Sequence, residues 1–148
     1  MRIFLDTDVL FDLYARRTPF FEDAERLMLM EMVGDAELWV TSESFTVIFY
    51  VMRKSVPAGS IQNAFGKSLE FLNVCSTNSD DILAATESAW PDFEDCLIDI
   101  CARKVKADYL LTRDADGFVR SDTPHPTPSE FFAILETRYG VTYETVAC

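Results

Sequence analysis

Acidic side chains stand at three places along this chain where they could hold a divalent cation. Asp6 follows the first apolar run, Asp114 and Asp116 follow a later one, and Asp95 stands near the start of the segment before it. Carboxylates that are brought together repel one another unless they are protonated or neutralised. Mg²⁺ and Mn²⁺ prefer such oxygen ligands, and a cation held this way supports phosphoryl chemistry by activating water and stabilising the leaving oxygen.

Each of these acids also has a purely structural explanation. Asp6 or Asp8 can cap a first helix, Asp92 is a suitable N-cap with Asp95 three residues later, and Asp114 can close a turn. We favour a shared metal site because several of them are expected to meet at one edge of a sheet.

Short apolar runs alternate with helical patterns along the chain. Strands are expected over 2–5, 37–40, 73–77 and 108–112, and helices over 9–16, 20–33, 42–54, 57–72, 79–87, 91–106 and 128–139. The proline-rich loop 123–128 could add a short strand. The alternation predicts one α/β domain over 1–148, with a parallel sheet of four to five strands and helices on both faces. Ligands bind outside the carboxyl ends of such strands, where Asp6 and Asp114 stand.

Composition excludes several classes of function. The 148 residues carry 25 acidic and 13 basic side chains, a formal net charge of −12, so no global positive field attracts nucleic acid. The five glycines form neither a dinucleotide fingerprint nor a phosphate loop. His125 is the one histidine and the four cysteines form no CxxC pair, so a zinc site is not expected.

The cysteines and the apolar runs indicate where the protein is expected in the cell. Free thiols are typical of a reducing compartment, so a cytoplasmic protein is expected. The first apolar run stops at Asp6, which is unlike a signal peptide. The longest apolar stretch, 45–52, is too short to span a bilayer, so no membrane association is expected.

Four segments in order resemble the PIN domain, and the most similar branch is that of the VapC-type toxins of bacterial toxin–antitoxin pairs. These segments are FLDTDVLFD, DFEDCLIDICA, LLTRDADGF and TPSEFF, and the resemblance covers nearly the whole chain. It implies a three-layer α/β/α fold and an endoribonuclease that depends on Mg²⁺ or Mn²⁺. It also implies RNA as substrate and a small antitoxin as partner.

The resemblance carries three acids onto this chain. Asp6 corresponds to the first metal-site aspartate, Asp95 to the aspartate at the start of the late helix, and Asp114, helped by Asp116, to the acid after the fourth strand. Asp8 stands where the family commonly has Asn. Together with Asp8, Asp92 and Thr112 are auxiliary candidates.

One family acid is missing. Its place in the helix that ends YVMRK falls at Val47. Glu43 lies one turn earlier on the same helix and could replace it. The alternative is that Glu43 is a first-turn glutamate that the helix dipole favours.

Three arginines are candidates for RNA contacts. Arg16, Arg53 and Arg113 lie near segments that reach the proposed site, and could bind phosphates while the cation offsets the carboxylates. The alternative for each is a solvated charge or an ordinary ion pair. The aromatic and Met-rich stripe over 45–52 is expected in the core, and its exposed part could form a homodimer or antitoxin surface.

Two other functions compete with the ribonuclease. A catalytically degenerate PIN-like module that binds nucleic acid or protein is suggested by Val47. A phosphatase of the haloacid dehalogenase type is suggested by IFLDTDVL, but Leu10 lacks the hydroxyl that this family needs.

Overall fold

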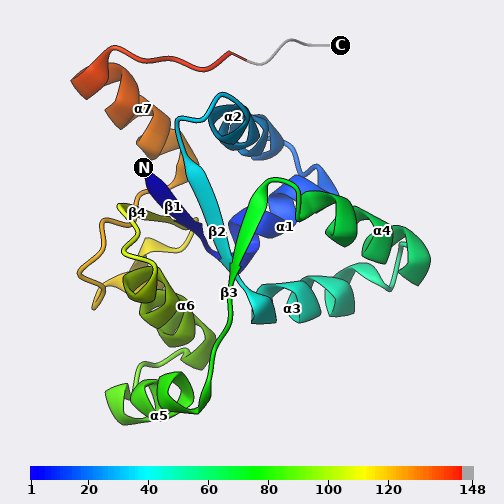
Figure 1. Cartoon of the computed structure of the whole chain (residues 1–148), viewed down its shortest axis with the longest axis vertical. Coiled ribbons are helices and arrows are strands. Elements are labelled where there is room, and N and C mark those ends of the chain that lie inside the picture. Colours follow the sequence, from blue (N-terminus) through cyan, green and yellow to red (C-terminus); the bar gives the residue numbers. More distant parts are fainter. Residues whose placement is uncertain (145–148) are drawn as a thin grey trace.

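The computed structural model describes residues 1–144, and its centre is a four-stranded parallel sheet in the order β3-β2-β1-β4. The strands are β1 (Arg2–Leu5), β2 (Glu37–Thr41), β3 (Leu72–Cys75) and β4 (Tyr109–Leu111). All four point the same way, so their carboxyl ends share one edge of the sheet (Figure 1). The predicted α/β class with a parallel sheet is confirmed.

Within residues 1–144, seven helices and one 3₁₀ turn connect and flank the strands. They are α1 (Thr7–Ala15), α2 (Phe21–Met32), α3 (Ser42–Met52), α4 (Ala58–Ser68), α5 (Ser79–Ser88), α6 (Phe93–Lys104), η1 (Ala115–Phe118) and α7 (Pro128–Tyr139). The predicted helices are all present, with differences at their ends. The first begins at Thr7 because Asp6 is its N-cap, and the fourth ends at Ser68 because β3 begins at Leu72.

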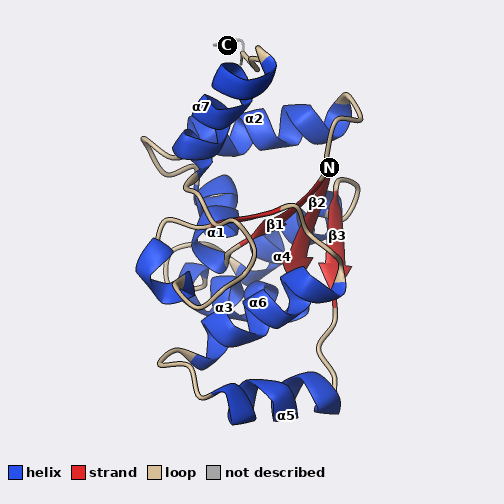
Figure 2. Cartoon of the chain, turned by 90° about the vertical axis from the view of Figure 1, so that its left-hand side faces the viewer, coloured by secondary structure: helices blue, strands red, loops and turns tan. Residues whose placement is uncertain are grey.

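The two faces of the sheet are covered by different helices, which gives three layers (Figures 1 and 2). Ile3 and Leu5 of β1 pack with α1, α2, α3 and α7 in the larger apolar cluster. Phe4, between them in sequence, points to the other face and packs with Ile98 of α6. The outer side of α6 packs in turn against Ala85 of α5. This alternation is the two-residue period of a strand that is buried on both faces.

The proline-rich loop forms no fifth strand. Instead, the backbone N–H groups of Leu110 and Thr112 donate to the carbonyl oxygens of Pro124 and Pro126, at 2.9 and 3.2 Å. Both prolines lack an N–H of their own, so they cannot return the donor half of a ladder. The loop therefore follows β4 as an extended segment, and the sheet has four strands.

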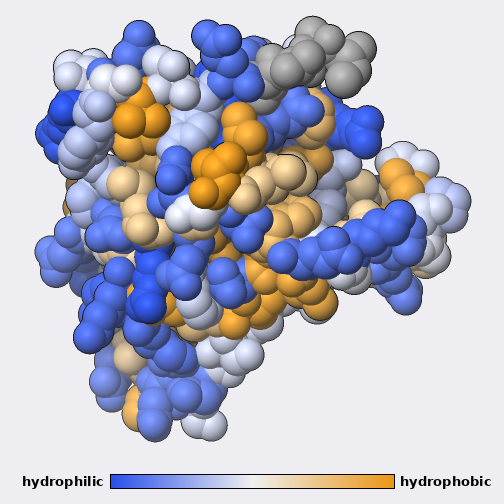
Figure 3. All heavy atoms as spheres, turned by 45° about the horizontal axis from the view of Figure 1, so that its top comes forward, coloured by the Kyte–Doolittle hydropathy of each residue, from blue (hydrophilic) through white to orange (hydrophobic). Residues whose placement is uncertain are grey.

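Apolar side chains remain uncovered on part of the surface. Figure 3 shows hydrophobic residues gathered in the middle of one face, with hydrophilic residues around them.

Cys75, Cys96 and Cys101 are buried free thiols, whereas Cys148 lies outside the described residues. Among the described residues, no helix has the length and apolar character needed to cross a membrane.

Candidate active site

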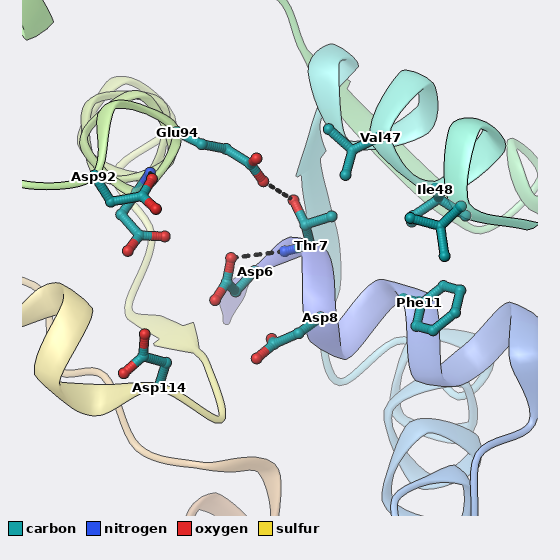
Figure 4. A pocket seen from close by; sticks show the side chains of 11 residues that line it. Asp6, Thr7, Asp8, Phe11, Val47, Ile48, Asp92, Glu94 and Asp114 are labelled. Carbon is teal, nitrogen blue, oxygen red and sulfur yellow. Dashed lines mark hydrogen bonds between the residues drawn. The ribbon is translucent and has the colours of Figure 1, made fainter.

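A pocket of about 320 Å³ opens at the carboxyl ends of β1 and β4 (Figure 4). It is lined by Asp6, Thr7, Asp8, Phe11, Val47, Ile48, Val51, Asp92, Glu94, Asp95 and Asp114. Side chains from α1, α3, α6 and the start of η1 thus face one space. None of the described residues that line this acidic pocket is a lysine or an arginine.

Asp6 lies at the floor of the acidic pocket, with 6% of its surface exposed. Its Oδ1 accepts from the backbone N–H of Thr7 at 2.7 Å, and its Oδ2 accepts from the Thr112 hydroxyl at 2.7 Å. Burial, and then the neighbouring carboxylate of Asp8, raise the pKa of Asp6 to about 8. The carboxyl group is therefore held rigidly where its negative charge is poorly compensated.

Thr112 joins Asp6 to the end of β4. Its hydroxyl oxygen, fully buried, also accepts from the backbone N–H of Asp114 at 2.9 Å. The position predicted as auxiliary from sequence thus connects two of the three acids that the family resemblance assigns.

Asp95 and Asp114 approach each other beside Gly117. A Cβ at Gly117 would lie 2.5 Å from Oδ2 of Asp95 and 3.0 Å from Oδ2 of Asp114. Burial raises the pKa of Asp95 to about 7, and the carboxylates of Asp92 and Asp114 add to this shift. Only a residue without a side chain leaves room for both carboxylates here.

Asp8 supplies a polar atom that lacks a partner. Its Oδ1 is buried and makes no hydrogen bond with any described residue. Burial raises the pKa of Asp8, although Arg113 opposes the shift. A bound cation would satisfy such an oxygen, whereas no protein donor does.

These carboxylates fit a hydrated Mg²⁺ or Mn²⁺ better than a metal that needs a full protein cage. Within residues 1–144, no three His, Cys, Asp or Glu side chains stand close enough together to enclose a metal ion by themselves. Mg²⁺ commonly keeps several waters and takes one or two carboxylates together with substrate phosphates. Asp6, Asp95 and Asp114 line the pocket from three elements, so one or two of them, with waters completing the coordination, would hold it.

The missing acid of α3 is not replaced from within that helix. Val47 lines the acidic pocket, whereas Glu43 does not. The carboxylate of Glu43 instead accepts hydrogen bonds from Thr77 and Ser42, close to the carboxyl end of β3. Asp116, proposed as a helper of Asp114, is exposed on η1 and does not line the pocket.

Among the described lining residues, Glu94 is the one acid that the sequence did not place among the site candidates. It projects from the first turn of α6 toward Thr7, whose hydroxyl donates to its Oε1 at 2.7 Å (Figure 4). The available signal was its place directly before Asp95, in the segment DFEDCLIDICA that resembles a family motif.

The three candidate arginines lie outside the acidic pocket. Arg113 donates twice to the buried carboxylate of Asp12, at 2.8 and 3.2 Å, and stacks on Phe20. Arg53 stacks on Tyr50 at the end of α3, with 4.3 Å from its guanidinium carbon to the ring centre. Arg16 lines a separate hollow between α1, α2 and α4. Direct phosphate contact inside the pocket therefore requires another source of positive charge.

A family comparison agrees with the geometry. The model of the PIN domain matches residues 2–116, so the chain belongs to the PIN domain family. No curated protein sequence matches it.

Solved structures share this fold at low sequence identity. VapBC-1 of nontypeable Haemophilus influenzae is 19% identical, with a TM-score of 0.65 over 87% of this chain and 99% of that one. VapC20 of Mycobacterium tuberculosis, a toxin that cleaves the sarcin-ricin loop, is 16% identical, with a TM-score of 0.64 over 80% and 94%. VapBC2 of Rickettsia felis, bound to a promoter DNA fragment, is 16% identical, with a TM-score of 0.62 over 85% and 97%.

Proposed function

We propose that this protein is an endoribonuclease that depends on Mg²⁺ or Mn²⁺ and acts as the toxin of a toxin–antitoxin pair. The observation that carries the proposal is the meeting of Asp6, Asp95 and Asp114, from three separate elements, around one pocket of a PIN domain. A cation bound there supplies an activated water and stabilises the charge on the leaving oxygen of a phosphodiester.

The chain's own residues hold and orient that site. The backbone N–H of Thr7 and the hydroxyl of Thr112 fix the two oxygens of Asp6, and Gly117 leaves space for Asp95 beside Asp114. The fold itself orients these carboxylates, which lowers the cost of ordering them during the reaction.

The charge balance defines how RNA would bind. A protein with a net charge of −12 repels a polyanion, and no lysine or arginine is among the described residues that line the pocket. RNA binding should therefore depend on the cation, assisted by Arg113 and Arg53 outside the pocket rim.

An antitoxin is the partner that we propose. Val47, Tyr50 and Val51 leave apolar surface exposed along α3, next to the pocket. Such a surface suits a partner segment or a second copy of the chain, and the acidic surface suits a basic antitoxin segment. We propose a homodimer as the assembly on the same basis, and the cytoplasm as the location because the described cysteines are free thiols.

A second function is a PIN-like module that binds nucleic acid or protein without cleaving RNA. Val47 favours it, because it leaves one wall of the pocket without the family's acid. The haloacid dehalogenase alternative has no comparable support, because Leu10 is fully buried in the core of a PIN domain.

The test is cleavage of total RNA by the purified protein with Mn²⁺, with EDTA, and with Asp6→Asn. Cleavage that needs Mn²⁺ and is lost in Asp6→Asn supports the ribonuclease. RNA that Asp6→Asn cuts as fast as the wild type does would exclude this site. Tight RNA or protein binding without any cleavage would favour the binding module, and phosphate release from small phosphoesters would favour a phosphatase.

A further inference from the structure

A row of buried hydroxyl groups ends on the carboxylate of Glu94. The Thr7 hydroxyl donates to Oε1 of Glu94 at 2.7 Å, and it lies 2.7 Å from the Ser44 hydroxyl. Ser44 in turn lies 2.9 Å from the hydroxyl of Thr41. Thr41 and Ser44 are each 1% exposed, so this row crosses the interior from the end of β2 to the acidic pocket.

The direction of these hydrogen bonds follows from counting protons. A hydroxyl has one proton to donate. Because Thr7 gives its proton to Glu94, Ser44 must donate to Thr7, and Thr41 must then donate to Ser44. All three O–H dipoles therefore point toward the carboxylate, and hydrogen bonds in such a chain strengthen one another.

The row fixes Glu94 on a particular wall of the acidic pocket. Figure 4 shows Glu94 reaching from α6 to Thr7 at the place where Val47 of α3 faces the pocket. Oε1 is occupied by Thr7, and among the described residues no donor binds Oε2. One carboxylate oxygen thus remains available beside a wall that would otherwise be apolar.

We propose that Glu94 is a positioning residue for the divalent cation of the acidic pocket. Its hydroxyl-anchored carboxylate supplies negative charge and a hydrogen-bond acceptor for the hydration shell of the cation, on the side where α3 presents Val47. This inference rests on the proposed function, since it assumes that the pocket binds Mg²⁺ or Mn²⁺.

The experiment is titration of the metal-free protein with Mn²⁺ by isothermal titration calorimetry. Glu94→Gln and Glu94→Ala should weaken Mn²⁺ binding about 10-fold to 100-fold, the usual effect of an outer-shell partner. Thr7→Val, which removes the anchor and retains the shape, should weaken it in the same direction. Glu87→Gln, the same charge change at an exposed site on α5, should leave it unaltered.

A rescue variant distinguishes this role from a merely structural one. Glu94→Ala combined with Val47→Glu restores a carboxylate to the same wall from α3, so it should recover Mn²⁺ affinity to within about fivefold of the wild type. Wild-type Mn²⁺ affinity in Glu94→Gln would overturn the inference, and so would failure of this rescue in a double variant that folds.

The two proposals fail in different ways. If the wild type binds Mn²⁺ and Asp6→Asn does not, the cation site stands, and wild-type affinity in Glu94→Gln then overturns only the role of Glu94. If the wild type itself binds no Mn²⁺, the metal-dependent function and the role of Glu94 both fall.

Discussion

In two acidic regions at the same edge of the sheet, the pKa values of the carboxyl groups are shifted in opposite directions. In the acidic pocket, beyond β1 and β4, Asp6 and Asp95 line the same space without a basic residue among the described lining residues, and burial raises both pKa values. Beyond β3, Asp81 accepts from Lys104 at 2.7 Å and closes a capping box with Asn78, and its pKa is lowered. We refer to the second region, Asp81 with Asn78 and Lys104, as the β3 corner.

The difference separates an acid whose charge the chain itself neutralises from acids whose charge it leaves uncompensated. Every oxygen contact of Asp81 stabilises its ionised form, and the β3 corner needs nothing from outside the chain. The pocket acids are held together at a cost in stability that only protons or a cation can relieve. Sites that conflict with stability in this way are typical of functional regions.

The largest effect should come from Asp6→Asn. RNA cleavage should fall at least about 100-fold, since even outer-shell partners of a metal are typically worth 10-fold to 100-fold. The free energy of unfolding of the metal-free protein should rise by about 1 kcal/mol or more, because a poorly compensated carboxylate is removed. Cleavage kinetics test the first expectation, and urea unfolding tests the second. A lower free energy of unfolding in Asp6→Asn would contradict the contrast between the acidic pocket and the β3 corner.

Gly117→Ala should come next. The new methyl group meets Oδ2 of Asp95 at 2.5 Å, so Asp95 and Asp114 must separate. Mn²⁺ affinity should fall about 10-fold, by analogy with other disturbances around a metal. Gly66→Ala in α4, where a Cβ meets nothing within 4 Å, is the matched control. The control should retain Mn²⁺ affinity and gain about 0.5–1 kcal/mol of stability.

The pH dependence of stability should have opposite signs in the two regions. The pKa of Asp6 is about 8 in the folded protein and 3.8 in the unfolded chain. Between these pH values the folded protein binds more protons than the unfolded chain does. Its stability should therefore fall as pH rises from 3.8 to about 8. Mn²⁺ should remove this loss by binding the ionised form. Melting temperatures between pH 5 and 8, with and without Mn²⁺, measure this loss of stability. Asp6→Asn should make the melting temperature of the metal-free protein less dependent on pH.

Asp81 should behave in the reverse sense. Its folded pKa is lowered, so its stabilisation is complete above 3.8 and is lost as pH falls through the folded pKa. Acid unfolding of Asp81→Asn against wild type isolates this contribution. A difference in stability between Asp81→Asn and wild type that still changes with pH above pH 6 would contradict the assignment.

The smallest effect should follow Lys104→Met. It removes a half-exposed ion pair and the donor to the Ser76 carbonyl, at 2.9 Å, so about 0.5–1 kcal/mol of stability should be lost. RNA cleavage and Mn²⁺ affinity should remain as in the wild type. A loss of Mn²⁺ affinity would show that the two regions are coupled rather than separate.

Local signals in the sequence were sufficient for most of the fold. Asp92, a candidate N-cap in the sequence, caps α6 in the structure, and its side chain accepts from the backbone N–H of Asp95 three residues later. Such caps act within one turn, so the residues themselves reveal them. The proposed fifth strand failed for a reason also visible in sequence, since Pro124 and Pro126 cannot donate.

The site was less accessible to this reasoning. Glu43 and Val47 lie one turn apart on α3, yet only Val47 lines the pocket, because Thr77 and Ser42 bind the Glu43 carboxylate. Glu94 enters the pocket because Thr7, 87 residues earlier, donates to it. Helical spacing gives the approximate face of a residue, but the direction of a long side chain depends on partners from other elements.

By itself, the sequence determined the alternation of strands and helices, the capping residues, and the placement of Asp6 and Asp114 beyond parallel strands. These follow from periodicity and local hydrogen bonding, which act over a few residues. Only the tertiary structure decided which acids share one pocket and which are neutralised, as Asp81 is by Lys104. The contact of Thr112 with Asp6 spans 106 residues. The packing of β1 against β4 creates this contact. Burial then leaves the negative charge of the pocket acids without compensation from the described lining residues.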